Sequence, residues 1–425
     1  MSLLPLPVLL LECVGRWMVC SGQWWPVSPL VLSVLLLCLL VRAGTGTVSM
    51  AAEGQGAHCV VAEDVTAALD RIRALGLKPT PVHTSATMDS LAGNHLFFKC
   101  ELFQKTGSFK ARGASNACSL LPAGVAVVTH SSGNHAQALA FAAAATGRAA
   151  AIVMPKTAPL PKQQATRGYG AEVSLCEPTN EARAKAAAKL VEDMGAELIH
   201  PSEHPNVIAG QGTVALELLE QVADLLAARP RDDAPEAVAS KKPRLDEASR
   251  PPIDVLVAPV GGGGLISGCA AYCKHHWPAM LVVGAEPEAM DDASRSKEAG
   301  SIQSNPAGKT TVADGLKTQL GPNTWPVVRD LVDNILCPRE EDILSATALV
   351  WSRMKLQIEP SAGVGVAVAL SSEFRRLLDS KFPDPQVRAS LRIGVVLCGG
   401  NADPVKLAPH LASAPPFPEG ALVNE

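Results

Sequence analysis

The sequence predicts an α/β protein with two doubly wound open sheets, in which a small domain is inserted into a larger one. Short apolar segments rich in valine, isoleucine and alanine alternate with helical segments, and such repeated βα units are typical of parallel sheets. The 425 residues are enough for two domains and a substantial core. Only 4% of the residues are aromatic, while alanine, glycine and valine are abundant. This composition favours helices that pack closely against a parallel sheet.

Charge and cysteine usage narrow the class of protein. The net charge of −4 at pH 7 gives no reason to expect binding to nucleic acid. Eleven cysteines, an odd number, are scattered without the spacing of a disulfide framework. Three of them, Cys13, Cys20 and Cys38, lie in the first 49 residues. In a chain of this length the others are best interpreted as reduced, buried thiols, which predicts a reducing, cytoplasmic location.

Residues 1–49 form a leader that we exclude from the fold prediction. Residues 27–41 are an apolar run that is short for a transmembrane helix and resembles the hydrophobic part of a signal peptide. The stretch before it contains few basic residues, whereas a signal peptide normally begins with several. Two interpretations stay open. The leader is a targeting or anchor segment, which would associate the protein with a membrane, or it is an upstream extension and Met50 is the physiological start.

Residues 50–122 are predicted to be the first part of the large domain. A helix is expected from Glu63, because Val65, Leu69 and Ile72 recur at three- and four-residue spacing. A strand over residues 96–99 follows.

Residues 123–204 are predicted to be a small, mobile domain. The expected strands are 125–129, 149–154, 172–175 and 197–200, and the expected helices are 136–146, 161–168 and 180–194.

Residues 205–425 are predicted to be the second part of the large domain. The expected strands are 254–258, 281–285 and 393–397, and the expected helices are 211–226, 265–276, 342–356 and 363–378. Residues 227–252 are rich in proline and charge and poor in large apolar side chains, which predicts a disordered surface insertion. The run Lys241-Lys-Pro-Arg within it also fits a nuclear address, although short basic runs are common by chance.

The most informative stretch is Thr106-Gly-Ser-Phe-Lys-Ala-Arg-Gly113. It predicts a turn that leads into a helix with Lys110 in the first turn. The N-terminus of a helix is the positive end of its dipole, so an ammonium group there is disfavoured. A lysine that acts as a neutral nucleophile gains from such a position. Taken alone, the residue is more simply interpreted as a solvated surface lysine.

Two further stretches favour a reactive lysine. Ser131-Ser-Gly-Asn-His135 is a small polar turn between a strand and an alanine-rich helix, and Gly261-Gly-Gly-Gly264 lies between a strand and a helix. Glycine runs in that position present backbone N–H groups to a phosphate. A lysine, a polar turn and a phosphate cradle together suggest pyridoxal phosphate, held through its aldehyde and its phosphate.

These motifs resemble the fold-type II pyridoxal-phosphate enzymes, and among them the serine racemase and serine/threonine dehydratase family. The resemblance extends from about Glu63 to about Pro404, with a break at the insertion. It implies that Lys110 bonds covalently to the cofactor aldehyde and later moves the substrate Cα proton on one face. The other residues that it implies for the cofactor are Phe109, Asn134, Gly261, Gly262, Gly263, Gly264, Leu265 and Cys398.

Cys398 departs from the usual pattern of the family. The racemases usually have serine at this position, beside the pyridine nitrogen, while some dehydratases have cysteine. Either group is neutral, so the nitrogen should stay largely unprotonated. The departure leaves racemase and dehydratase both open. A strand-end cysteine can also be just a small buried hydrophobe.

For the substrate, the resemblance implies Ser132 as the second base, on the face opposite Lys110. Dehydratases commonly have alanine there. The substrate carboxylate would be held by Ser131, His135 and Arg183, with Arg183 arriving when the small domain closes. The simpler interpretations are turn chemistry for Ser132 and a solvated helix residue for Arg183.

The resemblance also implies two ligands besides the cofactor. Glu286, Asp292 and the carbonyl of Met290 match a structural Mg²⁺ site, which Ca²⁺ or Mn²⁺ could also fill with waters completing the shell. A capped helix start is the alternative there. ATP, as an allosteric activator at the interface of a homodimer, is implied by five residues, which are Lys105, Thr106, Gln137, Lys355 and Asn401.

The sequence as a whole predicts an enzyme that interconverts L- and D-serine and also eliminates water from serine to give pyruvate and ammonia. One alternative is a serine/threonine ammonia-lyase (dehydratase) that does not racemise. A second is an inactive homologue that binds pyridoxal phosphate.

Overall fold

The computed structural model describes residues 17–20, 23–26, 58–228 and 250–415. Residues 1–57 and 58–425 form two separate units. In the first, β1 (Trp17–Cys20) and β2 (Gln23–Pro26) pair as an antiparallel hairpin. The apolar run 27–41 and residues 229–249 of the predicted insertion lie outside the described residues. None of the helices in the described part has the length and apolar character needed to cross a membrane.

The larger sheet of the second unit has six strands in the order β11-β10-β9-β12-β4-β3. All neighbours are parallel except β3, which runs antiparallel to β4 at the edge. The strands are β3 (Val82–His83), β4 (His95–Cys100), β9 (Val255–Pro259), β10 (Leu281–Ala285), β11 (Asn334–Leu336) and β12 (Arg392–Leu397). β9 and β10 are buried throughout, as expected for strands covered on both faces.

Helices cover this sheet on both faces. Gly394 and Val395 are consecutive in β12 and therefore point to opposite faces. A Cβ on Gly394 would meet Leu218 of α9 (Pro205–Ala227), while Val395 lies against Gly365 of α14 (Pro360–Ala369). The prediction of a doubly wound sheet is therefore confirmed for the larger sheet.

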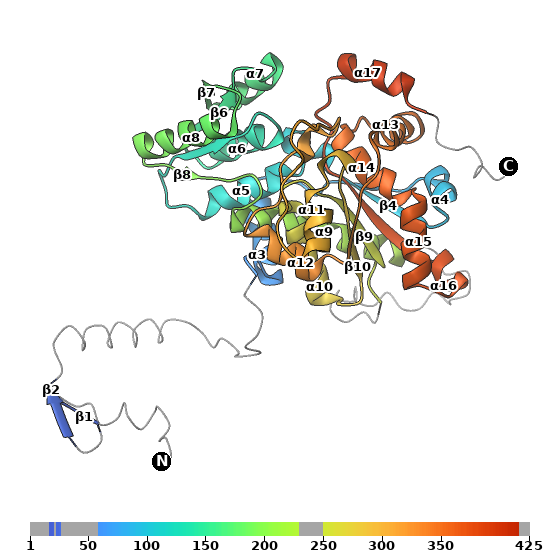
Figure 1. The fold of residues 1–425 in the computed structure, drawn as a ribbon, viewed down its shortest axis with the longest axis horizontal. Coiled ribbons are helices and arrows are strands. Elements are labelled where there is room, and N and C mark those ends of the chain that lie inside the picture. Colours follow the sequence, from blue (N-terminus) through green and yellow to red (C-terminus); the bar gives the residue numbers. More distant parts are fainter. Residues whose placement is uncertain (1–16, 21–22, 27–57, 229–249, 416–425) are drawn as a thin grey trace. The chain divides into compact units, whose positions relative to one another are not determined.

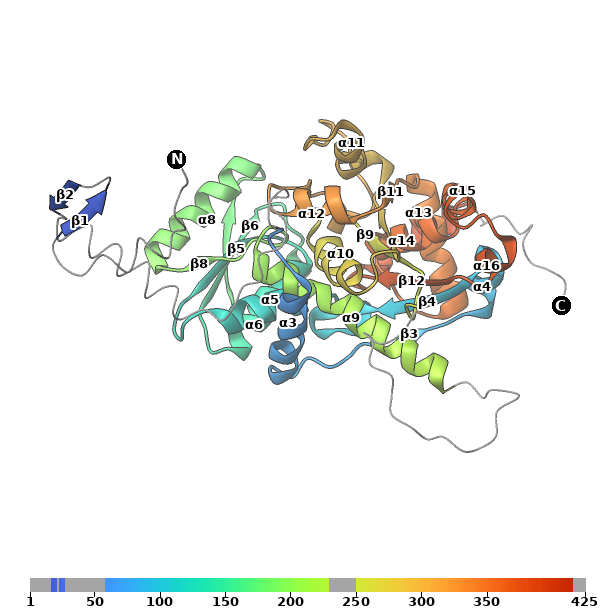
Figure 2. The ribbon, with the colours of Figure 1, turned by 90° about the horizontal axis from the view of Figure 1, so that it is seen from below.

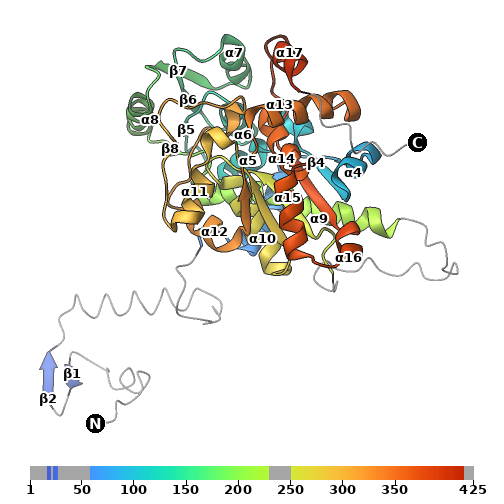
Figure 3. The same cartoon turned by 45° about the vertical axis from the view of Figure 1, so that its right-hand side comes forward.

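The smaller sheet has four parallel strands in the order β7-β6-β5-β8, all between residues 127 and 198. They are β5 (Val127–His130), β6 (Ala150–Pro155), β7 (Glu172–Cys176) and β8 (Glu197–Leu198). Figures 1 and 3 show this sheet beside α6 (Asn134–Ala145), α7 (Leu160–Gly168) and α8 (Asn180–Met194). Val127 and Val128 enter two different apolar clusters, so this sheet is also packed on both faces. The domain boundaries at residues 123 and 204 stay a prediction.

Most of the remaining helices lie around the larger sheet, while α5 (Lys110–Leu120) packs between α6 and α9 (Figures 2 and 3). The others are α3 (Ala62–Ala74), α4 (Ala86–Ala92), α10 (Gly264–His276), α11 (Asp292–Ala299), α12 (Thr324–Leu331), α13 (Glu340–Leu349), α15 (Ser372–Lys381), α16 (Pro385–Ala389) and α17 (Pro404–Ser413). The sequence analysis did not predict α4, α11, α12, α16, α17, β3 and β11. All of these except α17 are too brief to show a repeat.

Two predicted helices were wrong in extent. In place of the helix predicted over 342–356, α13 ends at Leu349 and a π-helical turn follows over Val350–Met354. That turn ends at Lys355, whose φ of 59° is left-handed. The helix predicted over 363–378 is two helices, because Ser371 is extended and its hydroxyl accepts a hydrogen bond from the N–H of Phe374 to begin α15.

Two other predicted boundaries, both beside the turn after β8, also differ from the structure. The helix predicted over 211–226 begins at Pro205, since proline suits the first helical turn and the His204 ring caps the N–H of Asn206. The strand predicted over 197–200 ends at Leu198 because His200 folds back onto the turn that follows.

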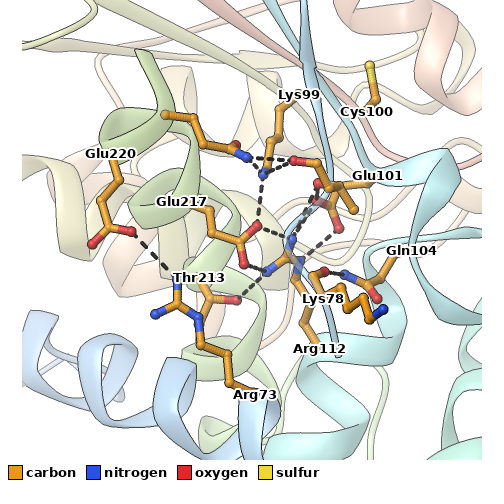
Figure 4. Close-up of polar contacts among 12 residues, drawn as sticks. Arg73, Lys78, Lys99, Cys100, Glu101, Gln104, Arg112, Thr213, Glu217 and Glu220 are labelled. Atoms are coloured by element: carbon orange, nitrogen blue, oxygen red, sulfur yellow. Dashed lines mark hydrogen bonds and ion pairs between the residues drawn. The ribbon is translucent and has the colours of Figure 1, made fainter. Parts of the chain in front are cut away.

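A buried ion network joins β4, α5 and α9 (Figure 4). Arg112 donates to both oxygens of Glu101 at 2.8 Å and to those of Glu217 at 3.0 and 2.7 Å. Lys99 donates to Glu217 at 2.8 Å, and the side chains of Lys99 and Arg112 are fully buried. Burial alone would raise the pKa of Glu217, but Arg112 and Lys99 lower it to about 2. Two cations and two carboxylates therefore balance inside the core.

We predict that Glu217→Ala lowers the free energy of unfolding by about 3–5 kcal/mol, because it leaves two buried cations with one carboxylate. Urea denaturation followed by circular dichroism measures this. Glu220→Ala is the matched control on the same helix: its carboxylate is 3.7 Å from Arg73 at the surface, and the expected loss is below about 1 kcal/mol. Equal losses in the two variants would contradict the assignment.

Candidate active site

Lys110 is the first residue of α5, and the chain before it is held against the end of β12. Thr106 and Gly107 both have left-handed φ angles, of 61° and 73°. A Cβ on Gly107 would lie 2.4 Å from Oδ1 of Asn401, so a side chain is excluded there. The N–H of Phe109 donates to the carbonyl of Cys398 at 3.1 Å. These contacts bring the lysine to the carboxyl end of β12.

The Lys110 amine is half-buried and held by a neutral partner. Its Nζ donates to the carbonyl of Pro201 at 2.8 Å and lies 4.9 Å from the centre of the Phe109 ring. Burial lowers the pKa of Lys110 to about 8. A sizeable fraction of the amine is therefore neutral near physiological pH, as a nucleophile or base requires.

The four glycines 261–264 link β9 to α10 and are closely surrounded. Gly263 has a φ of 77°, which favours glycine. A Cβ on Gly262 would lie 2.3 Å from the Ser202 hydroxyl, and one on Gly263 would lie 2.6 Å from Leu320. Only glycine fits, and the backbone amides stand at the N-terminus of a 13-residue helix. This geometry suits a phosphate group. Leu265 is buried in the first turn of that helix.

The turn that contains Pro201 and Ser202 contacts both Lys110 and the glycine loop. Pro201 accepts from Lys110, while Ser202 packs against Gly262 and Gly264. The Ser202 hydroxyl is buried and has no hydrogen-bond partner among the described residues. An unpaired buried hydroxyl beside a glycine loop fits a bound polar group. Sequence reasoning missed this turn, although a His-Pro-Ser run after a predicted strand was a signal for it.

A polar cluster lies beside the Cys398 end of β12. Asn134 donates to the buried carboxyl of Glu359 at 2.8 Å and accepts from Asn401 at 2.9 Å. Burial, with a smaller effect of Asp314, raises the pKa of Glu359 to about 7. Burial also raises the pKa of the Cys398 thiol, so this group stays neutral. The sequence did not single out Glu359, which carries no local motif.

The polar turn 131–135 connects β5 to α6. Ser131 and Ser132 are half-buried, and the Ser131 hydroxyl accepts a hydrogen bond from the N–H of Gly133 at 3.3 Å. His135 is buried, and its Nε2 lies 3.1 Å from the carbonyl of Ile199. Burial and the nearby Lys110 hold the pKa of His135 well below its usual value, so the ring is neutral. The amino end of a 12-residue helix at this turn favours a carboxylate.

Arg183 lies on α8. Burial, with a smaller effect of the Arg183 charge, lowers the pKa of His130, whose ring is edge-on to that of His200 at 5.6 Å. Arg183 is therefore close to the end of β5. Contact between Arg183 and a substrate stays a prediction.

The predicted metal residues follow β10. Glu286 is buried and accepts from the N–H groups of Ala293 and Ser294, both at 2.9 Å. Asp292 accepts from the N–H of Leu320 at 2.8 Å, and its second oxygen is buried with no hydrogen-bond partner among the described residues. Met290, which lies between these two residues in the sequence, is also buried. No group of three or more histidine, cysteine or acidic side chains in the described residues could hold a metal ion, so a cation here would need carbonyl and water ligands.

The predicted nucleotide residues are partly brought together. Asn401 donates to the Thr106 carbonyl at 2.7 Å and to Asn134 at 2.9 Å. Lys105 and Lys355 are exposed, and Gln137 is half-buried on α6. Asn401 thus links a predicted nucleotide residue to a predicted cofactor residue.

The chain is similar to several known proteins. The family described as pyridoxal-phosphate dependent enzyme matches residues 73–399. Serine racemase of Homo sapiens is 45% identical over 352 residues, which cover 81% of this chain and 92% of that protein. The solved structure of maize serine racemase has a TM-score of 0.71 and 38% identity, and the match covers 84% of this chain and 98% of that one. The solved structure of T.th. threonine deaminase has a TM-score of 0.68 and 40% identity, covering 81% and 99%.

We predict that the Lys110 amine, in protein freed of cofactor, is acetylated with a midpoint near pH 8, because burial lowers its pKa to about 8 and the neutral amine is the reactive form. Pulse labelling with acetic anhydride and mass spectrometry of the peptides measures this. Lys110→Arg is the control that removes the label from this position. A midpoint above about pH 10, the ordinary range of a solvated lysine, would contradict the structure.

Proposed function

The chain belongs to the pyridoxal-phosphate dependent enzymes, and we propose that it interconverts L- and D-serine, with elimination of serine to pyruvate and ammonia as a side reaction. The observation that carries the proposal is the lowered pKa of Lys110, whose amine lies close enough to His135 of the turn 131–135 to add to the effect of burial in lowering the pKa of that ring, and this turn contains Ser132. Burial is the cause of the lowered pKa of Lys110, and Ser132 is a half-buried residue with a hydroxyl group. Racemisation needs a proton donor and acceptor on each face of Cα, and these are two such groups.

The residues around Lys110 fit the cofactor. When bound, pyridoxal phosphate draws electrons from the substrate Cα and makes its proton acidic. Lys110 would bond covalently to the cofactor. The glycines 261–264 and Leu265 would hold its phosphate, and Asn134 would hydrogen-bond its ring hydroxyl. Phe109 would lie near the ring. The neutral Cys398 thiol would face the ring nitrogen and leave it without a proton.

The substrate would be oriented by the turn 131–135. Ser131 and His135, at the amino end of α6, would bind the serine carboxylate, and Arg183 would reach it from α8. Lys110 would then remove or return the Cα proton on one face, and Ser132 on the other. The same arrangement permits loss of the β-hydroxyl, which explains elimination as a side reaction.

A dehydratase that does not racemise is the second candidate. The 40% identity to T.th. threonine deaminase and the cysteine at position 398 favour it. Ser132 speaks against it, since dehydratases commonly lack a serine there. A chiral assay of serine with pyruvate measured in parallel separates the two, and an inactive homologue would give neither product.

We predict that Ser132→Ala lowers racemisation by about 10²–10⁴-fold, the usual contribution of one general acid–base group, while elimination from L-serine is retained in part. Lys110→Ala is the control and should abolish both reactions. D-serine and pyruvate are measured in the same reaction mixtures. Unchanged racemisation in Ser132→Ala would remove the two-base assignment.

The carboxylates of Glu286 and Asp292 fit a structural Mg²⁺, Ca²⁺ or Mn²⁺ ion, held also by the Met290 carbonyl and water. The unpaired oxygen of Asp292 supports this. Burial, together with nearby Asp292, raises the pKa of Glu286 to about 8, and burial raises that of Asp292 to about 6. A cation would favour the ionised forms of both groups.

The proposed cation site predicts that stabilisation of the fold by Mg²⁺ depends on pH. Because the two pKa values are raised in the folded state, the folded protein binds more protons than the unfolded chain, and stability falls as the pH rises from about 5 to 8. Millimolar Mg²⁺ should therefore raise the melting temperature by several degrees at pH 8, about the effect of 1–2 kcal/mol, and by less at pH 5.5.

Thermal melts with and without Mg²⁺ at the two pH values test this. Glu286→Gln should lose the effect, and Glu288→Gln, an exposed residue of the same loop, should keep it. An equal Mg²⁺ effect in both variants would argue against the site.

We also propose that ATP acts as an allosteric activator of a homodimer, through Lys105, Thr106, Gln137, Lys355 and Asn401. The hydrogen bonds from Asn401 to the Thr106 carbonyl and to Asn134 support a route from the nucleotide to the cofactor. A cytoplasmic location is supported by the eight cysteines between Cys59 and Cys398, all of which are free thiols.

A further inference from the structure

The turn 200–203 forms one wall of the glycine loop. The His200 Nδ1 accepts from the N–H groups of Ser202 at 3.3 Å and Glu203 at 3.0 Å, which closes the turn. Pro201 then faces Lys110, and Ser202 faces Gly262 and Gly264. The position of this turn therefore affects both the lysine and the loop.

The segment 320–324, which leads into α12, forms a second wall. A Cβ on Gly263 would lie 2.6 Å from Leu320 Cδ2 and 2.9 Å from Thr324 Cβ. The left-handed glycine of the loop is thus packed against this segment. The far end of the segment is tied to Asp292 through the Leu320 N–H.

Glu203 joins the two walls. One carboxylate oxygen accepts from the N–H of Asn323 at 2.7 Å, and the other accepts from the Thr324 hydroxyl at 2.6 Å. The Glu203 carbonyl also accepts from the Asn323 side chain at 2.7 Å. A Cβ on Gly321 would lie 2.3 Å from the Glu203 carboxyl carbon, so the contact is close as well as polar.

We propose that Glu203 is a positioning residue, which clamps the turn 200–203 to the segment 320–324 and so holds the glycine loop in the shape that receives the cofactor phosphate. This inference rests on the proposed function, since it concerns the same cofactor. Both carboxylate oxygens point to α12, so the negative charge is used at a helix N-terminus, where it is favourable. The clamp acts on the phosphate through the walls of the loop and without touching the phosphate.

A helix cap alone would also explain the contacts of Glu203 with α12. The two roles differ in one measurable respect. A cap that only stabilises the fold affects all ligands of the site equally. A clamp on the loop affects the affinity for the phosphate group and leaves the affinity for the rest of the cofactor unchanged.

The test compares pyridoxal phosphate with pyridoxal, which lacks the phosphate. Dissociation constants are measured by fluorescence titration on the full-length chain freed of cofactor. Glu203→Ala should weaken binding of pyridoxal phosphate by about tenfold or more, and that of pyridoxal by about twofold at most. Asp384→Ala is the matched control, because Asp384 also caps a helix with its carboxylate, at α16. It should change neither constant.

Thr324→Val is the second variant, in case Glu203→Ala does not fold. It keeps the side-chain shape but removes one hydroxyl that Glu203 accepts from. It should also weaken pyridoxal phosphate selectively. An unchanged ratio of the two constants in the folded variants would overturn the clamp alone. A wild-type chain that binds neither compound would overturn the proposed function, and the clamp with it.

Discussion

The structure depends on the buried charge balance around Arg112. The network joins β4, α5 and α9, and each of these elements leads directly to the site. Lys110 lies two residues before Arg112, and α9 begins just after the turn that accepts from Lys110. Buried charges are costly to desolvate and tolerate few arrangements, so the network restricts how these three elements can pack. The reactive lysine thereby gains a defined position from residues that do not touch the site.

The site lies where strands from both sheets end. The turn 131–135 follows β5, the turn 200–203 follows β8, the glycine loop follows β9, and Cys398 follows β12. In parallel sheets all carboxyl ends lie on one edge, which is where open α/β sheets bind ligands. Four turns, each ordinary alone, thus supply the carbonyl partner of Lys110, the glycine loop proposed to hold a phosphate, the turn proposed to hold the substrate carboxylate, and a neutral thiol.

Burial is the main cause of the electrostatics of this site. It lowers the pKa of Lys110 to about 8 and that of His200 to about 4, and it raises the pKa of Glu359 to about 7. Each shift favours the neutral form. A site with few fixed charges suits proton transfer at Cα and a cofactor whose ring nitrogen carries no proton. The proposed cation site differs, because burial and nearby Asp292 raise the pKa of Glu286, and a metal ion would favour the ionised forms of both carboxylates.

The sequence by itself determined the fold class, Lys110 at a helix start and the glycine loop, because turns, helix starts and strand periodicity are local properties of the chain. Helix ends such as Leu349 and the break at Ser371 were misjudged, since packing decided them. Only the tertiary structure decided that Pro201, Ser202 and Glu203 belong to the site, and that Arg112 is buried with two carboxylates. These contacts join residues about a hundred positions apart, and their pairing depends on the order of strands in the two sheets, which no local pattern encodes.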